Sequence, residues 1–350
     1  MKRYQLLFTA ACFGAVLVLV QQSPQVERFV QHAIQSSAST NLIGSPLGQL
    51  ARQVWREDPD TRKAKLLEHI QAEAKRLNVA PINAKVDRVW KAIPGYNGLE
   101  IDVEKTLELA ERESFPDPPK LLFREVPPQV GLEQLGPHPV YKGNPNKPMA
   151  AFMINVAWGE EYLPVILETL KKENVRATFF FDGSWLRKNI PMARTIMEQG
   201  HEMSNHAYSH KDMSKLSRAQ AFAEISKTEE LLKRELGVDN KLFAPPSGDF
   251  NQTTVEIAHS MKLRTILWTL DTVDWKNPEP SSIVRKIETR IEPGSLILMH
   301  PTSSSSKALP GMIRAIKSKG LQLGTVSEVI SPQRVPKVSS VCENVTLTRL

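Results

Sequence analysis

The sequence contains only two cysteines among its 350 residues, Cys12 in an apolar segment and Cys342 in the tail. Because the two lie in such different segments, we expect no disulfide between them. Lipidation of Cys12 is an alternative role for that residue. The apolar run continues past it to Val20, however, which favours a thiol buried in a membrane.

The basic residues do not cluster in any one segment. They outnumber the acidic residues, which gives a formal net charge of +7. A charge of this sign suits anionic surfaces such as lipid headgroups or cell-wall polymers. Its even spread along the chain, without a pattern of interleaved aromatic and basic residues, argues against a nuclease or a nucleic-acid binder. We therefore expect no nucleic-acid partner.

The apolar run from about Leu6 to Val20 is short for a membrane span and lacks a small-x-small cleavage site after it. It follows Met1-Lys2-Arg3, as the apolar region of a secretory signal follows its basic start. We predict an uncleaved signal-anchor over residues 1–22, which makes the membrane a partner and places the rest outside the cytoplasm. The alternative is a cleaved signal and a secreted protein.

The remaining chain divides by composition. Residues 23–57 are polar and predict a stalk, and 58–125 predict a small α+β module of unknown role, with helices from Asp58 and over 102–113 and a strand over 121–123. Residues 126–148 carry six prolines and three glycines, which predicts a linker. A large domain over 149–330 and a polar tail over 331–350 complete the chain.

In the large domain, short apolar runs alternate with helical stretches, the clearest of which is Ser217 to Leu236. The expected strands are 151–156, 177–181, 202–205, 241–243, 265–270, 296–300 and 321–326. This alternation predicts an α/β fold with a parallel sheet. Seven units in about 180 residues favour a distorted (β/α)7 barrel over an open sheet.

Polar residues gather where these strands end, which is where parallel α/β folds collect their working residues. His206 and His210 follow one strand, and imidazoles at this spacing can bind one divalent metal ion, such as zinc. The alternative is a pair of satisfied polar residues in a pocket without metal. His201, at the start of the same strand, is interpreted as structural.

Residues 149–330 resemble the polysaccharide deacetylases of the NodB-homology family, also called carbohydrate esterase family four. Among the family motifs, H-[ST]-x-x-H is matched through His206 and His210, D-x-x-D-W by residues 271–275, and L-x-H by 298–300. The layout, with a signal-anchor, the segment V-W-K-A-I-P-G-Y-N-G and N-V-A-W-G, is most similar to the sporulation-associated YlxY-type branch. The resemblance implies a NodB-like barrel that uses a divalent metal, usually zinc, to remove N-acetyl groups from peptidoglycan or chitin-like glycan.

The chain departs from the family pattern at three positions. The two aspartates of the motif T-F-D-D-G, a base and a metal ligand, align with Ala157 and Trp158, and the arginine of R-x-P-x-G aligns with Ala244. Alanine accepts no proton, and an indole offers no acceptor to an ion. Base and arginine are absent together, which is coherent because an arginine without its carboxylate would be an unpaired charge.

The resemblance still assigns roles at other positions. His300 is the acid, Asp274 orients it, and Trp275 and Pro246 stand at substrate-binding positions. Asp182, at the end of the second strand, is a candidate replacement for the missing base or ligand, with a helix N-cap as the alternative.

Trp158 itself can stack on a sugar ring or fill the former metal cavity. Glu160 and Glu161, which follow it, are interpreted as opening a helix.

Two functions follow. The first is a polysaccharide deacetylase of the cell envelope with an impaired site and a role in sporulation. The alternative is a catalytically inactive glycan-binding or scaffold protein on the same fold. Both take N-acetylated cell-wall glycan as the partner.

Overall fold

The computed structural model describes residues 58–114, 116, 118–335 and 346–347. The predicted signal-anchor, the stalk and most of the tail lie outside the described residues. Within the described ranges, no helix is long and apolar enough to cross a membrane. The described residues divide into two compact units, one comprising those up to Gln71 with those of Leu107–Pro119 and the other Ala72–Thr106 with those from Lys120 onward.

Short elements make up the part that precedes the large domain. They are α4 (Pro59–Leu77), β1 (Lys85–Asp87), β2 (Lys91–Ile93), β3 (Gly98–Ile101), α5 (Val103–Arg112) and β4 (Leu122–Val126). Strands β1 and β2 form an antiparallel hairpin, and β3 and β4 form another pair, to which β13 (Thr346–Leu347) adds in parallel. The first helix begins near Asp58 as expected, and the Asp58 carboxylate accepts the Thr61 N–H at 3.3 Å.

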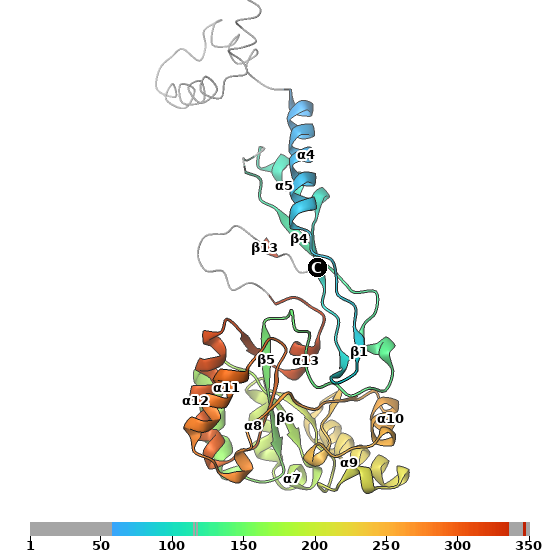
Figure 1. Ribbon diagram of the computed structural model, residues 1–350, viewed down its shortest axis with the longest axis vertical. Helices are drawn as coiled ribbons and strands as arrows, with labels where there is room; N and C mark the ends of the chain where they lie inside the picture. The colour runs from blue at the N-terminus through green and yellow to red at the C-terminus, as the bar shows by residue number, and fades with distance from the viewer. Residues whose placement is uncertain (1–57, 115, 117, 336–345, 348–350) are drawn as a thin grey trace, which may run out of the picture. The chain divides into compact units, whose positions relative to one another are not determined.

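A parallel sheet of eight strands forms the centre of the large domain (Figure 1). Its strands are β5 (Met149–Val156), β6 (Thr178–Phe181), β7 (Glu202–Asn205), β8 (Leu242–Phe243), β9 (Arg264–Thr265), β10 (Leu270–Asp271), β11 (Leu296–Met299) and β12 (Gln322–Gly324). The order is β10-β11-β5-β6-β7-β8-β9, and β12 also pairs with β5. The expected α/β class and parallel strands are confirmed. In the described sheet no pairing joins β9 to β10, so a curled half-barrel stands where a closed barrel was expected.

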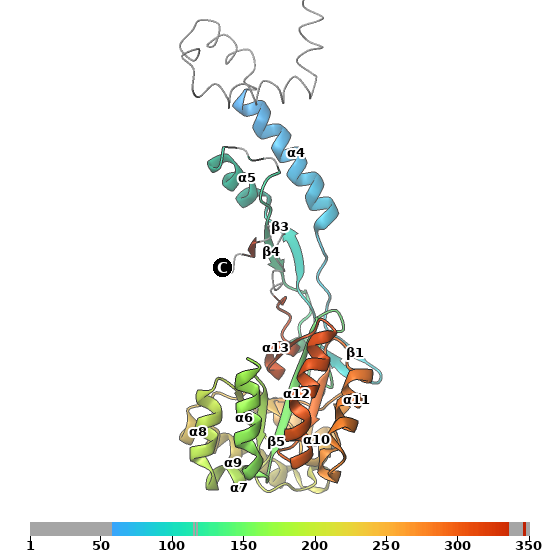
Figure 2. The ribbon, with the colours of Figure 1, turned by 90° about the vertical axis from the view of Figure 1, so that its left-hand side faces the viewer.

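Helices cover the outside of this sheet, as Figure 2 shows for α6 and α12 beside β5. The helices are α6 (Leu163–Lys172), α7 (Gly183–Lys188), α8 (Ile190–Glu198), α9 (Arg218–Leu236), α10 (Gln252–Ser260), α11 (Pro280–Arg290), α12 (Ser303–Ser318) and α13 (Val326–Ile330). Helix α9 begins where the sequence predicts, because Ser217 caps it by accepting the Gln220 N–H. It ends at Gly237, whose positive φ of 68° suits a residue without a side chain.

The side chains of β5 alternate between two apolar clusters. Phe152 and Ile154 pack in the cluster that includes the covering helices, whereas Ala151 and Met153 pack in a cluster on the other face of the sheet. Because a strand has a period of two, both faces of β5 are covered and all eight of its residues are buried. This accounts for the continuous apolar run in the sequence.

The expected strand over 265–270 is divided into β9 and β10. The Leu267 N–H donates to Val140 O at 2.8 Å, and the Val140 N–H donates to Thr265 O at 2.9 Å. The backbone hydrogen bonds that would continue one strand through these residues are therefore made to Val140, more than a hundred positions earlier in the chain. The polypeptide between β9 and β10 consequently leaves the ladder of the sheet.

Candidate functional site

The predicted site residues on three adjacent strands are aligned by strand register. The last residues of β6, β7 and β8 pair with one another across the sheet. The residues that follow, Asp182, His206 and Ala244, extend this ladder through hydrogen bonds of 2.9 to 3.0 Å from their N–H groups to the preceding strand. The parallel pairing thus brings the three positions to the same edge of the sheet.

His206 is held in one tautomer. Its Nδ1 lies 2.8 Å from Ala244 O, and a carbonyl can only accept, so Nδ1 carries the proton and Nε2 presents a lone pair. Burial lowers the pKa of His206 to about 3, with a smaller contribution from His210, so the imidazole is neutral near pH 7. A neutral imidazole with its other nitrogen fixed by a hydrogen bond is the state in which histidine binds a metal.

The loop after β7 turns His210 back toward His206. Their ring centroids lie 5.2 Å apart at an interplanar angle of 73°. Ala207 and His210 both have positive φ, and the Asn205 side chain accepts the Ala207 N–H at 2.7 Å. Glu224 of α9 accepts two further N–H groups of the loop, at 3.2 and 2.8 Å. Sequence analysis did not single out Glu224, although an acid among the apolar positions of the helix at 217–236 was the available signal.

In the described part of the chain, no third metal ligand joins the two imidazoles. Among the residues the structure describes, no group of three or more His, Cys, Asp or Glu side chains could hold a metal ion. Catalytic zinc usually has three protein ligands. The residues present therefore do not fit the three-ligand site that the resemblance implies.

Asp182, the candidate replacement, caps α7. Its Oδ1 accepts the Trp185 N–H at 3.0 Å and the Ser184 hydroxyl at 2.5 Å. Its Oδ2 is buried and makes no hydrogen bond to the described residues. Burial raises the pKa of this carboxyl above its ordinary value, and His210 acts against the rise. The N-cap role expected as the alternative is thus the one for which the structure provides contacts.

His300 and Asp274 form a tightly oriented pair. The Asp274 carboxylate is buried, and it accepts His300 Nδ1–H at 2.8 Å and the His300 backbone N–H at 2.6 Å. Val273 precedes it with a φ of 56°, a strained value for a β-branched residue. The carboxylate fixes the imidazole with Nε2 as its free nitrogen, which is the arrangement expected of an oriented acid.

Trp158 covers one face of this imidazole. Its indole is stacked on the His300 ring with centroids 5.8 Å apart and an interplanar angle of 9°, and the residue is 44% exposed. The next residue, Gly159, has a φ of 80°, and a Cβ there would lie 2.0 Å from Pro301 O. This close approach of the two strand ends places Trp158 beside His300.

Of the other two substrate-binding predictions, one is exposed and one is not. Trp275 is 55% exposed, and the Lys276 ammonium lies 4.8 Å from the centroid of its indole. Pro246 is buried and begins a turn in which Ser247 and Gly248 both have positive φ. Trp158 and Trp275 follow β5 and β10, the two strands that flank β11. Exposed indoles in this arrangement can stack on sugar rings.

His201 and Glu160 have contacts that fit their structural interpretations. His201 accepts the Ala177 N–H at 3.2 Å and packs on the Phe179 ring. Glu160 begins a 3-10 helix, Glu160–Tyr162, that leads into α6, and its carboxylate accepts the Trp185 indole N–H at 3.4 Å.

Comparison with known families gives a match to the polysaccharide deacetylase model over residues 142–266. An uncharacterised YlxY protein of Bacillus subtilis strain 168 is 44% identical over 275 residues, which are 79% of this chain and 86% of the relative. A peptidoglycan-N-acetylglucosamine deacetylase of Bacillus cereus is 32% identical over 202 residues, covering 56% of this chain and 74% of that enzyme.

Among solved structures, the chain is similar to a family four pseudoenzyme from Bacillus anthracis. The TM-score is 0.71 at 44% identity, covering 77% of this chain and 96% of the other. A mutant of that pseudoenzyme, described as having restored enzymatic activity, matches with a TM-score of 0.70 at 42% identity over 77% of this chain and 99% of the mutant.

Proposed function

Because this chain belongs to the polysaccharide deacetylase family, we propose that it binds N-acetylated cell-wall glycan through an impaired deacetylase site. One observation carries the proposal, namely that Trp158, which the motif alignment puts at the position of the family's metal-binding aspartate, stacks on His300. The indole occupies a ligand position without offering an acceptor, and it also covers a face of the expected acid.

The impairment has three physical sources. Proton transfer by a positioned base commonly contributes roughly 10²- to 10⁴-fold in rate, and Ala157 offers no base. Only two imidazoles remain of the three-ligand set. The imidazole of His300 would have to protonate a leaving amine while the indole of Trp158 lies against it. Each source lowers turnover, and none of them prevents a sugar chain from binding.

The proposed partner follows from the exposed aromatic side chains and from the relatives. Trp158 and Trp275 are exposed indoles that follow the two strands flanking β11, and such faces suit the apolar face of a pyranose. The Bacillus cereus relative is a peptidoglycan-N-acetylglucosamine deacetylase. We therefore assign peptidoglycan, with N-acetylglucosamine as the recognised sugar, as the glycan.

A second candidate function is a residual metal-dependent deacetylase. It is favoured by the tautomer of His206, whose free Nε2 lies beside His210, and by the intact pair of His300 and Asp274. Zinc or another divalent metal would be its cofactor. The restored activity of the mutant Bacillus anthracis pseudoenzyme supports the idea that this fold loses turnover through few residues.

Binding and turnover are separated by one experiment on the full-length protein in detergent. Binding to purified peptidoglycan is measured for the wild type, for Trp158→Ala, and for Phe222→Ala, a control that removes an aromatic side chain of similar exposure from α9. We expect Trp158→Ala to weaken binding by about tenfold or more, as removal of a buried aromatic anchor does, and Phe222→Ala to leave it unchanged.

Acetate release from chitooligosaccharide is measured in parallel with added zinc. Binding without acetate release fits the proposed function. Acetate release that His206→Ala abolishes would establish the second candidate instead. Absence of peptidoglycan binding by the wild type would overturn the proposal.

We also propose that the protein is anchored outside the cytoplasm by residues 1–22 and acts in sporulation. The first part is supported by Lys2 and Arg3 before an apolar run, and the second by the resemblance to the YlxY-type branch. Protease added to intact protoplasts should remove the domain while leaving a membrane-embedded fragment. A deletion strain that forms spores normally would contradict the second part.

A further inference from the structure

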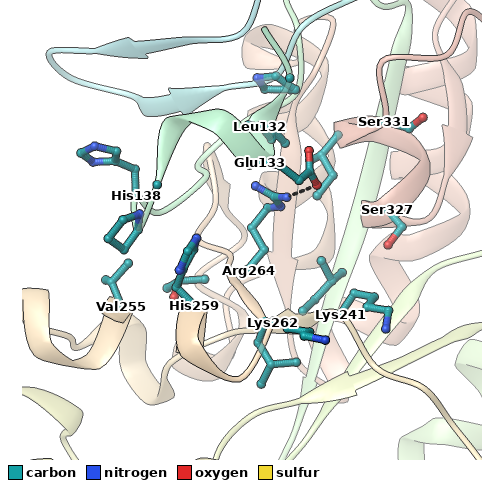
Figure 3. A pocket seen from close by; sticks show the side chains of 18 of the residues that line it. Leu132, Glu133, His138, Lys241, Val255, His259, Lys262, Arg264, Ser327 and Ser331 are labelled. Carbon is teal, nitrogen blue, oxygen red and sulfur yellow. Dashed lines mark hydrogen bonds and ion pairs between the residues drawn. The ribbon is translucent and has the colours of Figure 1, made fainter. Parts of the chain in front are cut away.

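A cavity of about 550 Å³ lies at the amino ends of β8 and β9 (Figure 3). Its walls come from residues 241–242, from segments 131–138, 255–265 and 327–332, and from Pro94 and Gly95. The candidate glycan site occupies the carboxyl ends of the same sheet. The two are therefore separate features, and the deacetylase resemblance assigns nothing to this cavity.

The charged side chains of the cavity are mainly cationic. Lys241, Lys262 and Arg264 line it, whereas Glu133 is the single acid among its lining residues. A hollow lined by one sign of charge concentrates ligands of the opposite sign. The cavity is therefore suited to an anion.

Arg264 is the best placed of these cations to bind one. Its side chain is only 21% exposed, and burial lowers its pKa, with Glu133 acting against the shift. Nη2 donates to Glu133 Oε1 at 2.7 Å, and this is the one hydrogen bond that the guanidinium makes to the described residues. A guanidinium has five N–H donors in a planar fork, so four of these donors make no hydrogen bond to the described residues.

Glu133 is an easily displaced partner. Its side chain is 78% exposed, and it contacts the guanidinium through one oxygen. Ion pairs with so exposed a member contribute little to stability, because the carboxylate is almost equally well solvated by water. A phosphate can bind the same fork through two parallel hydrogen bonds, which a single carboxylate oxygen does not do.

The rest of the cavity fits a ligand body that carries hydroxyl groups. A volume of about 550 Å³ is far larger than an inorganic anion requires, and Leu132 and Val255 give it apolar walls. Ser327 and Ser331 line the opposite wall (Figure 3). Thr265, next to Arg264 in the chain, also lines the cavity, and its buried Oγ1 has no hydrogen-bond partner in the described structure.

We infer that this cavity binds the phosphate group of a sugar phosphate or polyol phosphate. On binding, the Arg264 guanidinium exchanges its hydrogen bond to Glu133 for hydrogen bonds to the phosphate. Lys262 and Lys241, the second of which also pairs with the exposed Asp239 at 2.6 Å, add charge around the phosphate. Ser327 and Ser331 line the wall beside the ligand body. The source of the phosphate is either a soluble monomer or the repeating phosphodiester of a wall polymer.

The test uses the full-length protein in detergent and two variants with opposite expected effects. Binding of glycerol 3-phosphate, glucosamine 6-phosphate and poly(glycerol phosphate) is measured by calorimetry at low ionic strength. Arg264→Gln should weaken binding by about tenfold or more, since it removes the charged fork. Glu133→Gln should tighten binding several-fold, since it removes the competing carboxylate, and its exposed position makes misfolding no concern.

The control is an Arg–Glu pair outside the cavity, Arg218 and Glu256, whose charged atoms lie 3.4 Å apart. Arg218→Gln and Glu256→Gln should leave phosphate binding unchanged, as should Trp158→Ala at the glycan site. Binding of the polymer alone identifies a wall polymer as the source, and binding of monomers identifies a soluble ligand. Failure of every probe to bind, or equal binding by Arg264→Gln, would overturn the inference.

Discussion

The missing base and the missing arginine should be energetically coupled, and restoring them one at a time tests this. Ala244 is fully buried and packs in an apolar cluster with Met153 and Phe180. A guanidinium introduced there by Ala244→Arg would have no carboxylate of its own. An uncompensated buried charge destabilises a protein by about 3–5 kcal/mol, and we expect a loss of stability of that size.

Ala157→Asp should behave differently. Ala157 is only partly buried. We therefore expect a carboxylate there to lower the free energy of unfolding by less than about 1 kcal/mol, as surface substitutions usually do. Combined with Ala244→Arg it supplies the missing partner. We expect the double variant to recover about 2 kcal/mol of the loss, which is within the range of coupling energies measured for neighbouring charges.

Trp158→Asp completes the set. It removes the indole from His300 and places a carboxylate beside the two imidazoles, so zinc affinity should rise in the triple variant relative to the double variant. With the base restored, acetate release should increase by roughly 10²- to 10⁴-fold over the wild type. His206→Ala in the triple background should abolish both effects.

The assays are urea unfolding for the cycle, calorimetry for zinc and enzymatic detection of acetate. If Ala244→Arg were as stable as the wild type, or if Ala157→Asp failed to rescue it, the two positions would not face each other. An unchanged zinc affinity in the triple variant would show that position 158 is not the ligand position. Either result would refute the alignment on which the proposed function depends.

Three further predictions concern single residues. Burial lowers the pKa of His201 to about 4, so between pH 6.5 and 4 the unfolded chain binds the extra proton and the free energy of unfolding falls as pH falls. Relative to His201→Gln, the wild type should lose about 3 kcal/mol across this window in chemical denaturation, and parallel pH profiles would contradict the assignment. Glu224→Ala should destabilise the protein by about 2–3 kcal/mol, because it leaves N–H groups of the histidine loop unpaired, and hydrogen exchange at Ser209 should accelerate; unchanged protection there would mean that another group holds the loop. Gly159→Ala should cost at least about 2 kcal/mol in thermal unfolding, from its positive φ and the overlap with Pro301, and a variant as stable as the wild type would show that the two strand ends are farther apart.

The fold was largely predictable because its signals are local. The expected strands at β5, β6 and β7 and the capped helix from Ser217 coincide closely with the observed elements. Prediction failed where a partner distant in sequence intervened. The strand expected over 265–270 is interrupted because its backbone forms hydrogen bonds with Val140. No sequence pattern within 265–270 predicts this partner.

The candidate site divides in the same way. The positions of His206, His210 and His300 could be predicted because each follows an expected strand, and the register of parallel strands places strand ends together. Asp274 follows β10, which the expected strand over 265–270 did not separate from β9. The roles of side chains without such a pattern could not. The sequence offered Asp182 as a replacement ligand or base but favoured an N-cap, and its hydrogen bonds to α7 are those of an N-cap.

By itself the sequence determined a parallel α/β domain with two imidazoles and an aspartate–histidine pair at its strand ends. It also determined that the paired aspartates of the family motif are absent. Both follow from residue order, because periodicity and motif spacing are properties of the sequence. Tertiary structure alone decided that Trp158 lies on His300, since this depends on the contact of Gly159 with Pro301. It alone also assembled the cationic cavity, whose walls come from five separate stretches of chain. Contacts between remote segments are set by how layers pack, and packing distances are not encoded in any local pattern.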